Sequence, residues 1–520
     1  MAPITRSKAI QLPPNTLALS NLNLFQPSDE IQHSTGYKAT DGAPHLHETP
    51  DGSMLDFPHI YQTNSQASGS SSSNSHSSDD APAIYIIDLS LPPSQRYVKL
   101  ATELKLVIED LVDLFDELLD QVGLPKKTFH FFAKCILRKL YSKEQTEELR
   151  GIHNVTRVPM YLLVAYNVLL DLFMGCTSGG VVVKERDSQG RMCHFRTLDW
   201  GMPTLRKALV QLEFRNEADG EAIARSINYA GFVGTLTGVR KGLSVSFNSR
   251  PYHNDDGSKR ANAKFYSHLL LVLLGWRPSI CTHLRDLIIP KDEGLKKKDV
   301  QVKKKGARIG ENRQDYKYSH NSLANIAKDF PSTPTTAGYL TFCDGTQTLI
   351  LEKDRVTAKP LLSSSFLTVT NHDTSYDAPS SISSDTPASA EHVTRAKTHK
   401  LNPGMDILVE ESMDRKGCMT QAWATRLKTL KLKKKDGERG YVGLEQLKEW
   451  MLKYPVTNEQ THFVAIMDPT EGVFRWVRMW EKGHIGSEGW GEGWIYESGD
   501  VGEGWIDESG DEGEGSGRSV

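Results

Sequence analysis

The feature that most constrains the fold of this chain is a pair of strand-like runs within residues 175–202. The first run, 181–185, reads VVVKE, and the second run, 192–200, reads MCHFRTLDW. Polar residues and a glycine at 187–190 separate the two runs, so the pattern predicts a β-hairpin. An apolar helical pattern over 158–174 comes directly before it. A helix that leads into a hairpin excludes an all-helical fold.

The other patterned segments add both helices and strands. Residues 84–91 read as a strand, and apolar positions at helical spacing then predict a helix that runs to about Val122. Further helices are expected over 127–150, 262–274 and 279–288, and further strands over 208–214, 223–233 and 243–249. The fold class that these elements predict is α+β.

Polar segments of low complexity interrupt this pattern. Only 38% of the 520 residues are hydrophobic, so part of the chain is not expected to join a core. Residues 1–82 are predicted to be disordered, and residues 481–520 form an acidic, Gly-rich tail. Inserted loops are expected near 291–317 and near 374–400. The lysines of the first loop are expected to face solvent, with contact to an anionic lipid surface as the alternative.

The composition excludes several kinds of site. A net charge of −3 gives no argument for a nucleic-acid partner. None of the six cysteines has C-x-x-C spacing, which argues against a zinc knuckle and a dense disulfide scaffold. His45, His47 and Glu48 have metal-binding side chains but lie in the segment predicted to be disordered. We therefore expect no metal and no cofactor.

No membrane anchor is expected from the sequence. The N-terminus lacks the continuous apolar stretch of a secretory signal. The longest apolar run, 160–174, is interrupted by Asn167 and Asp171 and is shorter than the roughly 20 residues that span a bilayer. These observations predict a soluble protein.

The stretch around Cys176 has the residue types of an amide-hydrolysing site. If the chain breaks between Gly175 and Cys176, the thiol becomes a nucleophile and the new α-amine, with a pKa near 8, becomes its base. A guanidinium such as that of Arg196 would favour the thiolate. The alternative is that Cys176 is a buried core residue, and that Arg196 and Asp199 form a simple ion pair.

A set of blocks along the chain carries a resemblance to a known family. The blocks are IDLSLPPSQRY at 87–97, NVLLDLFMGCTS at 167–178, HFRTLDWGM at 194–202, YAGFVGTLTGVRKGLSVSFNSR at 229–250, TVTNHD at 368–373, MDRKGCM at 413–419 and HFVAIMDPTEGVFRW at 462–476. In this order they resemble acid ceramidase and its relative, the N-acylethanolamine-hydrolyzing acid amidase.

The resemblance implies a fold and a role for each matching residue. The implied fold is the four-layer αββα sandwich of N-terminal-nucleophile hydrolases, with a helical α-subunit at 83–175 and a catalytic β-subunit at 176–480. Cys176 matches the nucleophile of self-cleavage, and Arg196 and Asp199 match residues that orient its thiol and α-amine. Asn371 matches an oxyanion-hole donor, with a turn asparagine as the alternative. Arg415 matches a second active-site arginine, with a solvated arginine as the alternative.

The sequence also departs from the family. Relatives usually carry Glu immediately before the arginine that Arg250 matches, whereas this chain has Ser249. One N-glycosylation sequon is present, at Asn154. The family is found in acidic, lysosome-like or vacuole-like compartments, but no signal for such a compartment is visible here.

Several functions follow from these patterns. The first is hydrolysis of ceramide to a sphingoid base and a fatty acid, and the second is hydrolysis of N-acylethanolamines or other fatty-acid amides. A non-catalytic lipid-binding scaffold of the same fold is the alternative of another class. A cysteine–histidine hydrolase that uses His194 or His372 is a further option. The partners implied are a lipid amide and the two pieces of one self-cleaved chain.

Overall fold

The computed structural model describes residues 81–121, 125–169, 175–185, 189–253, 258–289, 322–377, 405–430 and 440–480. All of them belong to one unit of the chain, Met1–Gly483. The predicted disordered N-terminus up to residue 80, the 291–317 loop, most of the 374–400 loop and the 481–520 tail lie outside the described residues. The His45, His47 and Glu48 set does so too. No described helix combines the length and the apolar character needed to cross a bilayer.

The segment before Cys176 is a cluster of short helices. They are α1 (Val98–Glu103), α2 (Lys105–Glu109), α3 (Leu111–Gln121), α4 (Lys126–Ile136), α5 (Lys143–Thr156) and α6 (Met160–Leu169). The single helix predicted up to Val122 is therefore wrong. The backbone leaves helical values at Leu104, with φ −104° and ψ 25°, and the resulting bend lets both α1 and α2 contact α5.

The helix predicted over 127–150 is also two helices, α4 and α5. The chain leaves helical geometry at Leu137, and Ser142 then caps α5 by accepting a hydrogen bond from the backbone nitrogen of Gln145. α5 ends at Arg157, which has a positive φ of 63° and precedes Pro159 by two residues.

An eight-stranded sheet contains strands from both sides of Cys176. Its order is β1-β4-β5-β6-β7-β8-β9-β10. The strands are β1 (Ile84–Asp88), β4 (Leu209–Arg215), β5 (Ala222–Tyr229), β6 (Thr237–Arg240), β7 (Leu243–Ser249), β8 (Gly338–Cys343), β9 (Thr348–Lys353) and β10 (Ala358–Ser363). β1 pairs with β4 in parallel, and the other neighbours are antiparallel.

A five-stranded sheet contains the predicted hairpin. Its order is β11-β2-β3-β12-β13. The strands are β2 (Gly175–Val183), β3 (Arg191–Asp199), β11 (Phe366–Val369), β12 (Thr461–Asp468) and β13 (Val473–Met479).

The first strand of the hairpin starts earlier than predicted. β2 begins at Gly175 and not at Val181, so Cys176 lies within the strand. The glycines between Cys176 and Val181 are closely packed and do not interrupt the strand. A Cβ atom at Gly180 would lie 1.8 Å from Oγ1 of Thr348 in β9, so only glycine fits where the two sheets meet.

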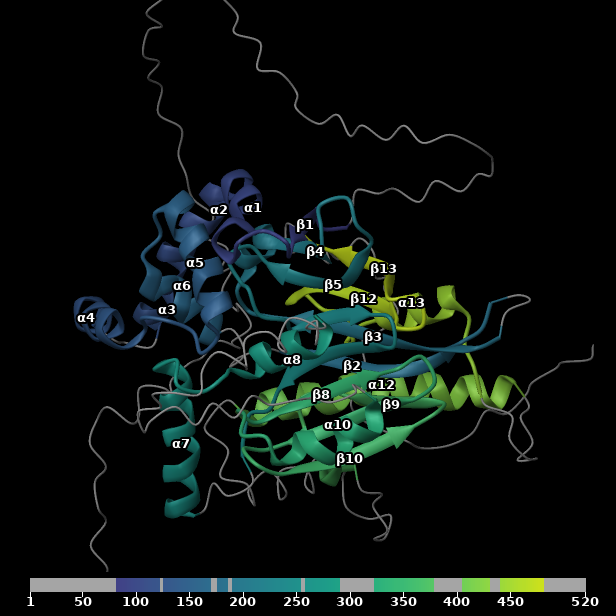
Figure 1. Ribbon diagram of the computed structural model, residues 1–520. Coiled ribbons are helices and arrows are strands. Elements are labelled where there is room, and N and C mark those ends of the chain that lie inside the picture. Colours follow the sequence, from purple (N-terminus) through teal and green to yellow (C-terminus); the bar gives the residue numbers. More distant parts are fainter. Residues whose placement is uncertain are drawn as a thin grey trace, which may run out of the picture. The chain divides into compact units, whose positions relative to one another are not determined.

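The two sheets pack face to face, and helices flank them (Figure 1). β2 contacts β7, β8 and β9 of the larger sheet. α8 (Ile280–Ile288) and α10 (Leu323–Asp329) contact the larger sheet, and α12 (Met405–Thr429) and α13 (Leu444–Leu452) contact the smaller one. α7 (Lys259–Leu273) contacts α6. The predicted α+β class, with two sheets and flanking helices, is confirmed.

Candidate functional site

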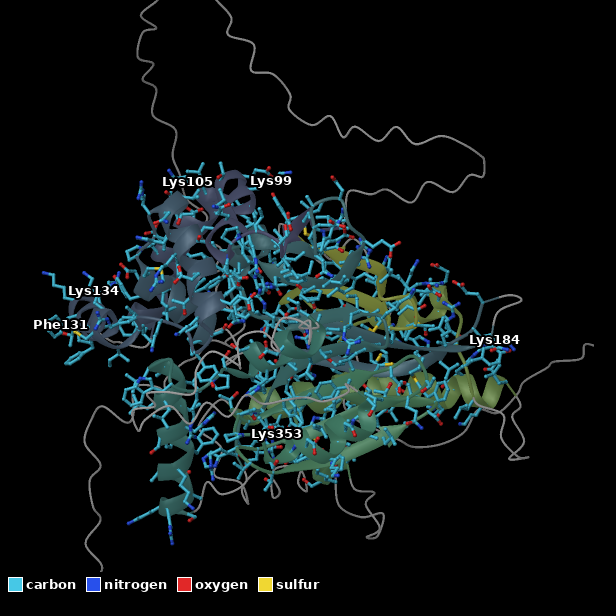
Figure 2. The ribbon with its side chains drawn as sticks, in the orientation of Figure 1. Lys99, Lys105, Phe131, Lys134, Lys184 and Lys353 are labelled. Carbon is cyan, nitrogen blue, oxygen red and sulfur yellow. The ribbon has the colours of Figure 1, made fainter. Side chains whose placement is uncertain are left out.

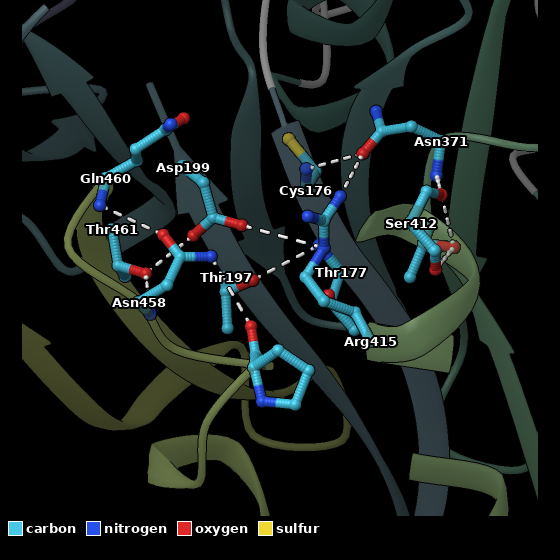
Figure 3. Close-up of polar contacts among 12 residues, drawn as sticks. Cys176, Thr177, Thr197, Asp199, Asn371, Ser412, Arg415, Asn458, Gln460 and Thr461 are labelled. Atoms are coloured by element: carbon cyan, nitrogen blue, oxygen red, sulfur yellow. Dashed lines mark hydrogen bonds and ion pairs between the residues drawn. The ribbon is translucent and has the colours of Figure 1, made fainter. Parts of the chain in front are cut away.

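Cys176 lies at the start of β2, where the two sheets meet, and its exposed fraction is 0%. Its backbone nitrogen donates a hydrogen bond to Oδ1 of Asn371 at 2.8 Å. Its sulfur lies 3.4 Å from Nη2 of Arg196 and 4.0 Å from the carbonyl oxygen of Phe247. Both the thiol and the nitrogen of the Gly175–Cys176 peptide therefore have polar partners in the intact chain, and Figure 3 shows the bond from the nitrogen to Asn371.

Arg196 is a fully buried cation held by neutral groups. Its Nη1 donates to Oδ1 of Asn248 at 2.7 Å and to Oγ of Ser178 at 3.1 Å. Ser178 lies opposite Arg196 in the pairing of β2 with β3, which brings the guanidinium to the thiol two residues earlier. Among the residues that the structure describes, no carboxylate lies within 4 Å of this guanidinium.

The thiol of Cys176 is held in its neutral form by its surroundings. Burial raises its pKa, and the Asp199 carboxylate raises it further. The guanidinium groups of Arg196 and Arg415 act in the opposite direction, but burial is the larger effect. A nucleophilic role for this thiol would therefore need a base to take its proton.

Asp199 lies opposite Gly175 in the β2–β3 pairing, so its carboxyl group flanks the bond before Cys176. Its Oδ1 accepts a hydrogen bond from Oγ1 of Thr461 at 2.7 Å, and its Oδ2 lies 3.9 Å from Nε of Arg415. Burial raises the pKa of Asp199 to about 6, although Arg415 and Thr461 oppose the shift. A carboxyl group with this pKa can hold or release a proton in mildly acidic solution.

Asn371 follows β11 and is oriented by partners on both sides of its amide. Its Oδ1 accepts from Nη2 of Arg415 at 2.9 Å as well as from the nitrogen of Cys176. Its Nδ2 donates to the carbonyl oxygen of Ser249 at 2.8 Å. In the intact chain the carbonyl oxygen of Asn371, and not its amide nitrogen, therefore faces Cys176. Its role as an oxyanion donor stays a prediction.

α12 delivers two residues to this region from one face. Arg415 reaches between Asp199 and Asn371 (Figure 3). Ser412, three residues earlier, accepts a hydrogen bond from the backbone nitrogen of Asn371 at 2.6 Å. Residues three apart lie side by side on a helix, so one helix fixes Asn371 from two directions.

The structure brings together all five residues predicted from the sequence, namely Cys176, Arg196, Asp199, Asn371 and Arg415. It adds four polar residues that the sequence analysis missed, which are Ser178, Asn248, Ser412 and Thr461. Ser178 and Asn248 stand inside blocks that carry the family resemblance, which is the one signal that points to them.

His194 and His372, the two histidines considered for a cysteine–histidine hydrolase, form their hydrogen bonds with groups other than the Cys176 thiol. The ring nitrogens of His194 lie 3.0 Å and 2.9 Å from the hydroxyl oxygens of Ser244 and Ser246. His372 contacts Ser412 and Asp377. No group of three or more His, Cys, Asp or Glu side chains suited to a metal ion occurs in the described part of the chain.

Comparisons with known proteins bear on this site. A family model described as the beta subunit of N-acylethanolamine-hydrolyzing acid amidase matches residues 80–140. Acid ceramidase of Heterocephalus glaber is 26% identical over 183 residues, which cover 32% of this chain and 45% of that protein. N-acylethanolamine-hydrolyzing acid amidase of Caenorhabditis elegans is 31% identical over 184 residues, which cover 33% of this chain and 49% of that protein. Over the matched residues, this chain is similar to members of the acid ceramidase and N-acylethanolamine-hydrolyzing acid amidase family.

The similarity to these proteins covers part of the chain. The chain spans about half the length of the curated family members that it matches. The solved structure of a Caenorhabditis elegans N-acylethanolamine-hydrolyzing acid amidase ortholog is 17% identical, with a TM-score of 0.36, and covers 59% of this chain and 100% of that one. The family model, which is named for a beta subunit, matches residues before Cys176.

Proposed function

We propose that this chain is a cysteine amidohydrolase of the N-terminal-nucleophile type. It cuts itself between Gly175 and Cys176, and it then hydrolyses the N-acyl amide bond of ceramide to a sphingoid base and a free fatty acid. The observation that carries the proposal is the set of contacts around Cys176. Arg196 lies beside its thiol, Asn371 binds its backbone nitrogen, and Asp199 flanks the bond before it.

The proposed self-cleavage is an acyl shift from nitrogen to sulfur. The sulfur of Cys176 loses its proton and bonds to the carbonyl carbon of Gly175, and the bond from that carbon to the nitrogen of Cys176 then breaks. The nitrogen takes up a proton, which Asp199 is suited to supply because burial raises its pKa to about 6, and the proton that the thiol loses restores the Asp199 carboxyl group. Water hydrolyses the resulting thioester, which frees the thiol and the α-amine of Cys176.

The proposed hydrolysis reuses the same atoms. The new α-amine takes the proton of the thiol, and the thiolate bonds to the acyl carbon of the lipid amide. The amine product leaves with that proton, and water then releases the fatty acid from the sulfur. Asn371 Oδ1, which accepts from the nitrogen of Cys176 in the intact chain, would hold the α-amine in place.

Burial of the nucleophile supports processing before substrate binding. Cys176 has an exposed fraction of 0% in the uncut chain, so a lipid amide has no access to its sulfur. We infer that separation at Gly175 opens the site. The two pieces would be the helical segment 83–175 and the catalytic segment 176–480. The fold would be the four-layer N-terminal-nucleophile sandwich, with the nucleophile on a strand where two sheets meet.

The second candidate substrate is an N-acylethanolamine. The 31% identity to a nematode N-acylethanolamine-hydrolyzing acid amidase favours it, and both substrates place a long acyl chain on an amide. The non-catalytic scaffold is the weaker alternative. A buried arginine with a purely structural role is expected to pair with a carboxylate, whereas Arg196 binds the neutral groups of Ser178 and Asn248 and lies beside the thiol. The pKa of about 6 for Asp199 supports an acidic compartment, because the carboxyl group carries its proton below that pH.

Mass spectrometry of the purified protein, before and after incubation in acid, tests the nucleophile. The wild-type chain should give two fragments that separate before Cys176. Cys176→Ala should stay as one chain and have no amidase activity. Clean cutting of that variant at the same bond would overturn self-cleavage by Cys176.

A comparison of amides tests the substrate class. The processed enzyme should hydrolyse a long-chain ceramide faster than a short acetyl amide. A higher rate on an N-acylethanolamine than on ceramide would select the second candidate, and equal rates on all three would indicate a general amidase.

A further inference from the structure

A groove lined by positive charges lies between α7 and the turn that joins β9 to β10. It consists of two hollows of about 420 Å³ and 460 Å³. Arg260 and Lys264 from α7 and Arg355 from the turn line both hollows. His268 and Arg277 line the second one. These five residues define the basic groove, and none of them belongs to the candidate site around Cys176.

The positive charges of the basic groove have no carboxylate partners in the described part of the chain. Among the described residues, none of its three arginines and its one lysine has a carboxylate oxygen within 4 Å. Asp354 is the one acidic residue among the described lining residues. Two arginines that are buried do have such partners, as Arg250 has in Asp373 and Arg285 in Glu148. Positive side chains that surround a hollow and lack carboxylate partners favour the binding of an anion in that hollow.

His268 lines the second hollow and carries a buried donor. Its Nδ1 lies 3.0 Å from Nη1 of Arg277, and because a guanidinium can only donate, the ring proton must lie on Nε2. That nitrogen is buried and has no hydrogen-bond partner among the described residues. Burial, together with the charges of Arg277, Arg355 and Lys353, lowers the pKa of His268 to about 4. The ring is therefore a neutral donor that lacks an acceptor, which is rare for a buried group.

A buried lysine holds the turn that carries Arg355 in place through hydrogen bonds to its backbone. Nζ of Lys353, at the end of β9, donates to the backbone carbonyl oxygens of Asp354 and Arg355. Burial lowers the pKa of Lys353 to about 7. A bound anion would stabilise the charged form of this lysine, so the buried cation and an anion in the groove would support each other.

We propose that the basic groove binds a phosphate group, carried either by a lipid headgroup or by a soluble phosphate ester. Arginine forks and a neutral imidazole N–H all donate, and phosphate oxygens accept several such bonds at once. Each hollow exceeds the volume of one phosphate group, which leaves room for the rest of the ligand. The proposal does not depend on the chemistry proposed for Cys176.

Titration calorimetry of the intact chain with inorganic pyrophosphate tests the site. The wild-type protein should bind pyrophosphate, and the double variant Arg260→Gln/Arg355→Gln should bind it about tenfold more weakly for each guanidinium removed. A second variant, Lys264→Gln, removes a charge from the exposed face of α7 and should weaken binding without affecting folding. The matched control is Lys99→Gln/Lys105→Gln, which removes two exposed charges from α1 and α2 (Figure 2).

Sedimentation with vesicles separates the two sources of phosphate. If the ligand is a lipid headgroup, the chain should sediment with phosphatidylcholine vesicles that contain phosphatidic acid but not with phosphatidylcholine alone, and pyrophosphate should release it. If the ligand is soluble, pyrophosphate should bind while neither vesicle does. The proposal is overturned if neither pyrophosphate nor vesicles bind, or if the Lys99/Lys105 control weakens binding as much as the groove variants.

Discussion

Nη2 of Arg196 lies 3.4 Å from the sulfur of Cys176, and no carboxylate among the described residues lies within 4 Å of that guanidinium. A buried cation without a counter-ion is unfavourable, because burial removes its hydration. The thiolate of Cys176 is the anion best placed to compensate it. In the proposed mechanism Arg196 would favour the thiolate, even though burial keeps the resting thiol neutral.

Arg196→Gln should slow self-cleavage. A hydrogen bond to a charged group contributes roughly 1.5–3 kcal/mol, which corresponds to a rate that is about 10- to 100-fold lower. Fragment appearance on denaturing gels measures the rate. Arg240→Gln is the matched control, since that half-buried guanidinium binds only carbonyl oxygens, and it should process normally. Wild-type kinetics in Arg196→Gln would show that the guanidinium does not assist the thiol.

Self-cleavage should depend on pH through Asp199. Its pKa of about 6 means that the carboxyl group carries a proton below this pH and loses it above. If it protonates the departing nitrogen, the rate should fall by about tenfold for each pH unit above about pH 6. Thr461 donates to this carboxylate and lowers its pKa, so Thr461→Val should move the fall to higher pH. A rate that does not change with pH would exclude Asp199 as the acid.

Asn371→Asp separates two roles of the side chain. The carboxylate can still accept from the nitrogen of Cys176 and from Arg415, so self-cleavage should continue. It cannot donate a hydrogen bond, so hydrolysis of a lipid amide should fall by roughly 10²–10³ if Asn371 stabilises the oxyanion. Asn371→Ala, which loses both functions, should fail to process. Full hydrolytic activity in Asn371→Asp would assign the residue a role as acceptor alone.

The sequence predicted the hairpin well in its second half and poorly in its first. β3 and the end of β2 contain apolar and β-branched residues, which give a clear strand signal. The start of β2 consists of small residues that fit between two sheets, and small residues resemble a loop. The breaks at Leu104 and Leu137 were missed for a related reason, since they depend on contacts with α5 and on the cap at Ser142 and not on helix-breaking residues.

The candidate site was only partly accessible to sequence reasoning. Arg196 and Asp199 follow Cys176 within one hairpin, so local pattern is enough to connect them. Asn371 lies 195 residues after Cys176, and only the family resemblance pointed to it and to Arg415. The orientation of the Asn371 amide is set by long-range partners and could not be predicted from spacing.

Glu148→Gln should destabilise the contact between the two pieces of the chain. Glu148 in α5 binds Arg285 in α8 through two bonds of 2.5 Å and 2.7 Å, and both side chains are buried. Removing one partner of a buried ion pair costs about 3–5 kcal/mol. Urea unfolding should show this loss, and the processed pieces should separate in size-exclusion chromatography. Glu147→Gln, which breaks an exposed pair with Arg150, should change neither result.

Ser249 lies inside the candidate site through its backbone. It ends β7, and its carbonyl oxygen accepts the hydrogen bond from Nδ2 of Asn371. Relatives in the family usually carry Glu at the position that Ser249 matches. A serine hydroxyl does not titrate in the working range, so it cannot replace a carboxyl group as a proton carrier. Either Asp199 carries the proton in this chain, or self-cleavage is slow.

Ser249→Glu should accelerate conversion of the full-length chain, most clearly in mildly acidic solution, because it adds a carboxyl group whose pKa burial would raise. Ser249→Gln is the matched control, since it adds nearly the same volume without a titratable proton and should give no acceleration. The time course of fragments at several pH values measures the effect, and mass spectrometry should show that the bond before Cys176 is still the one cut. If Ser249→Glu converts no faster than Ser249→Gln, the missing carboxyl group does not limit processing, and Asp199 alone is sufficient.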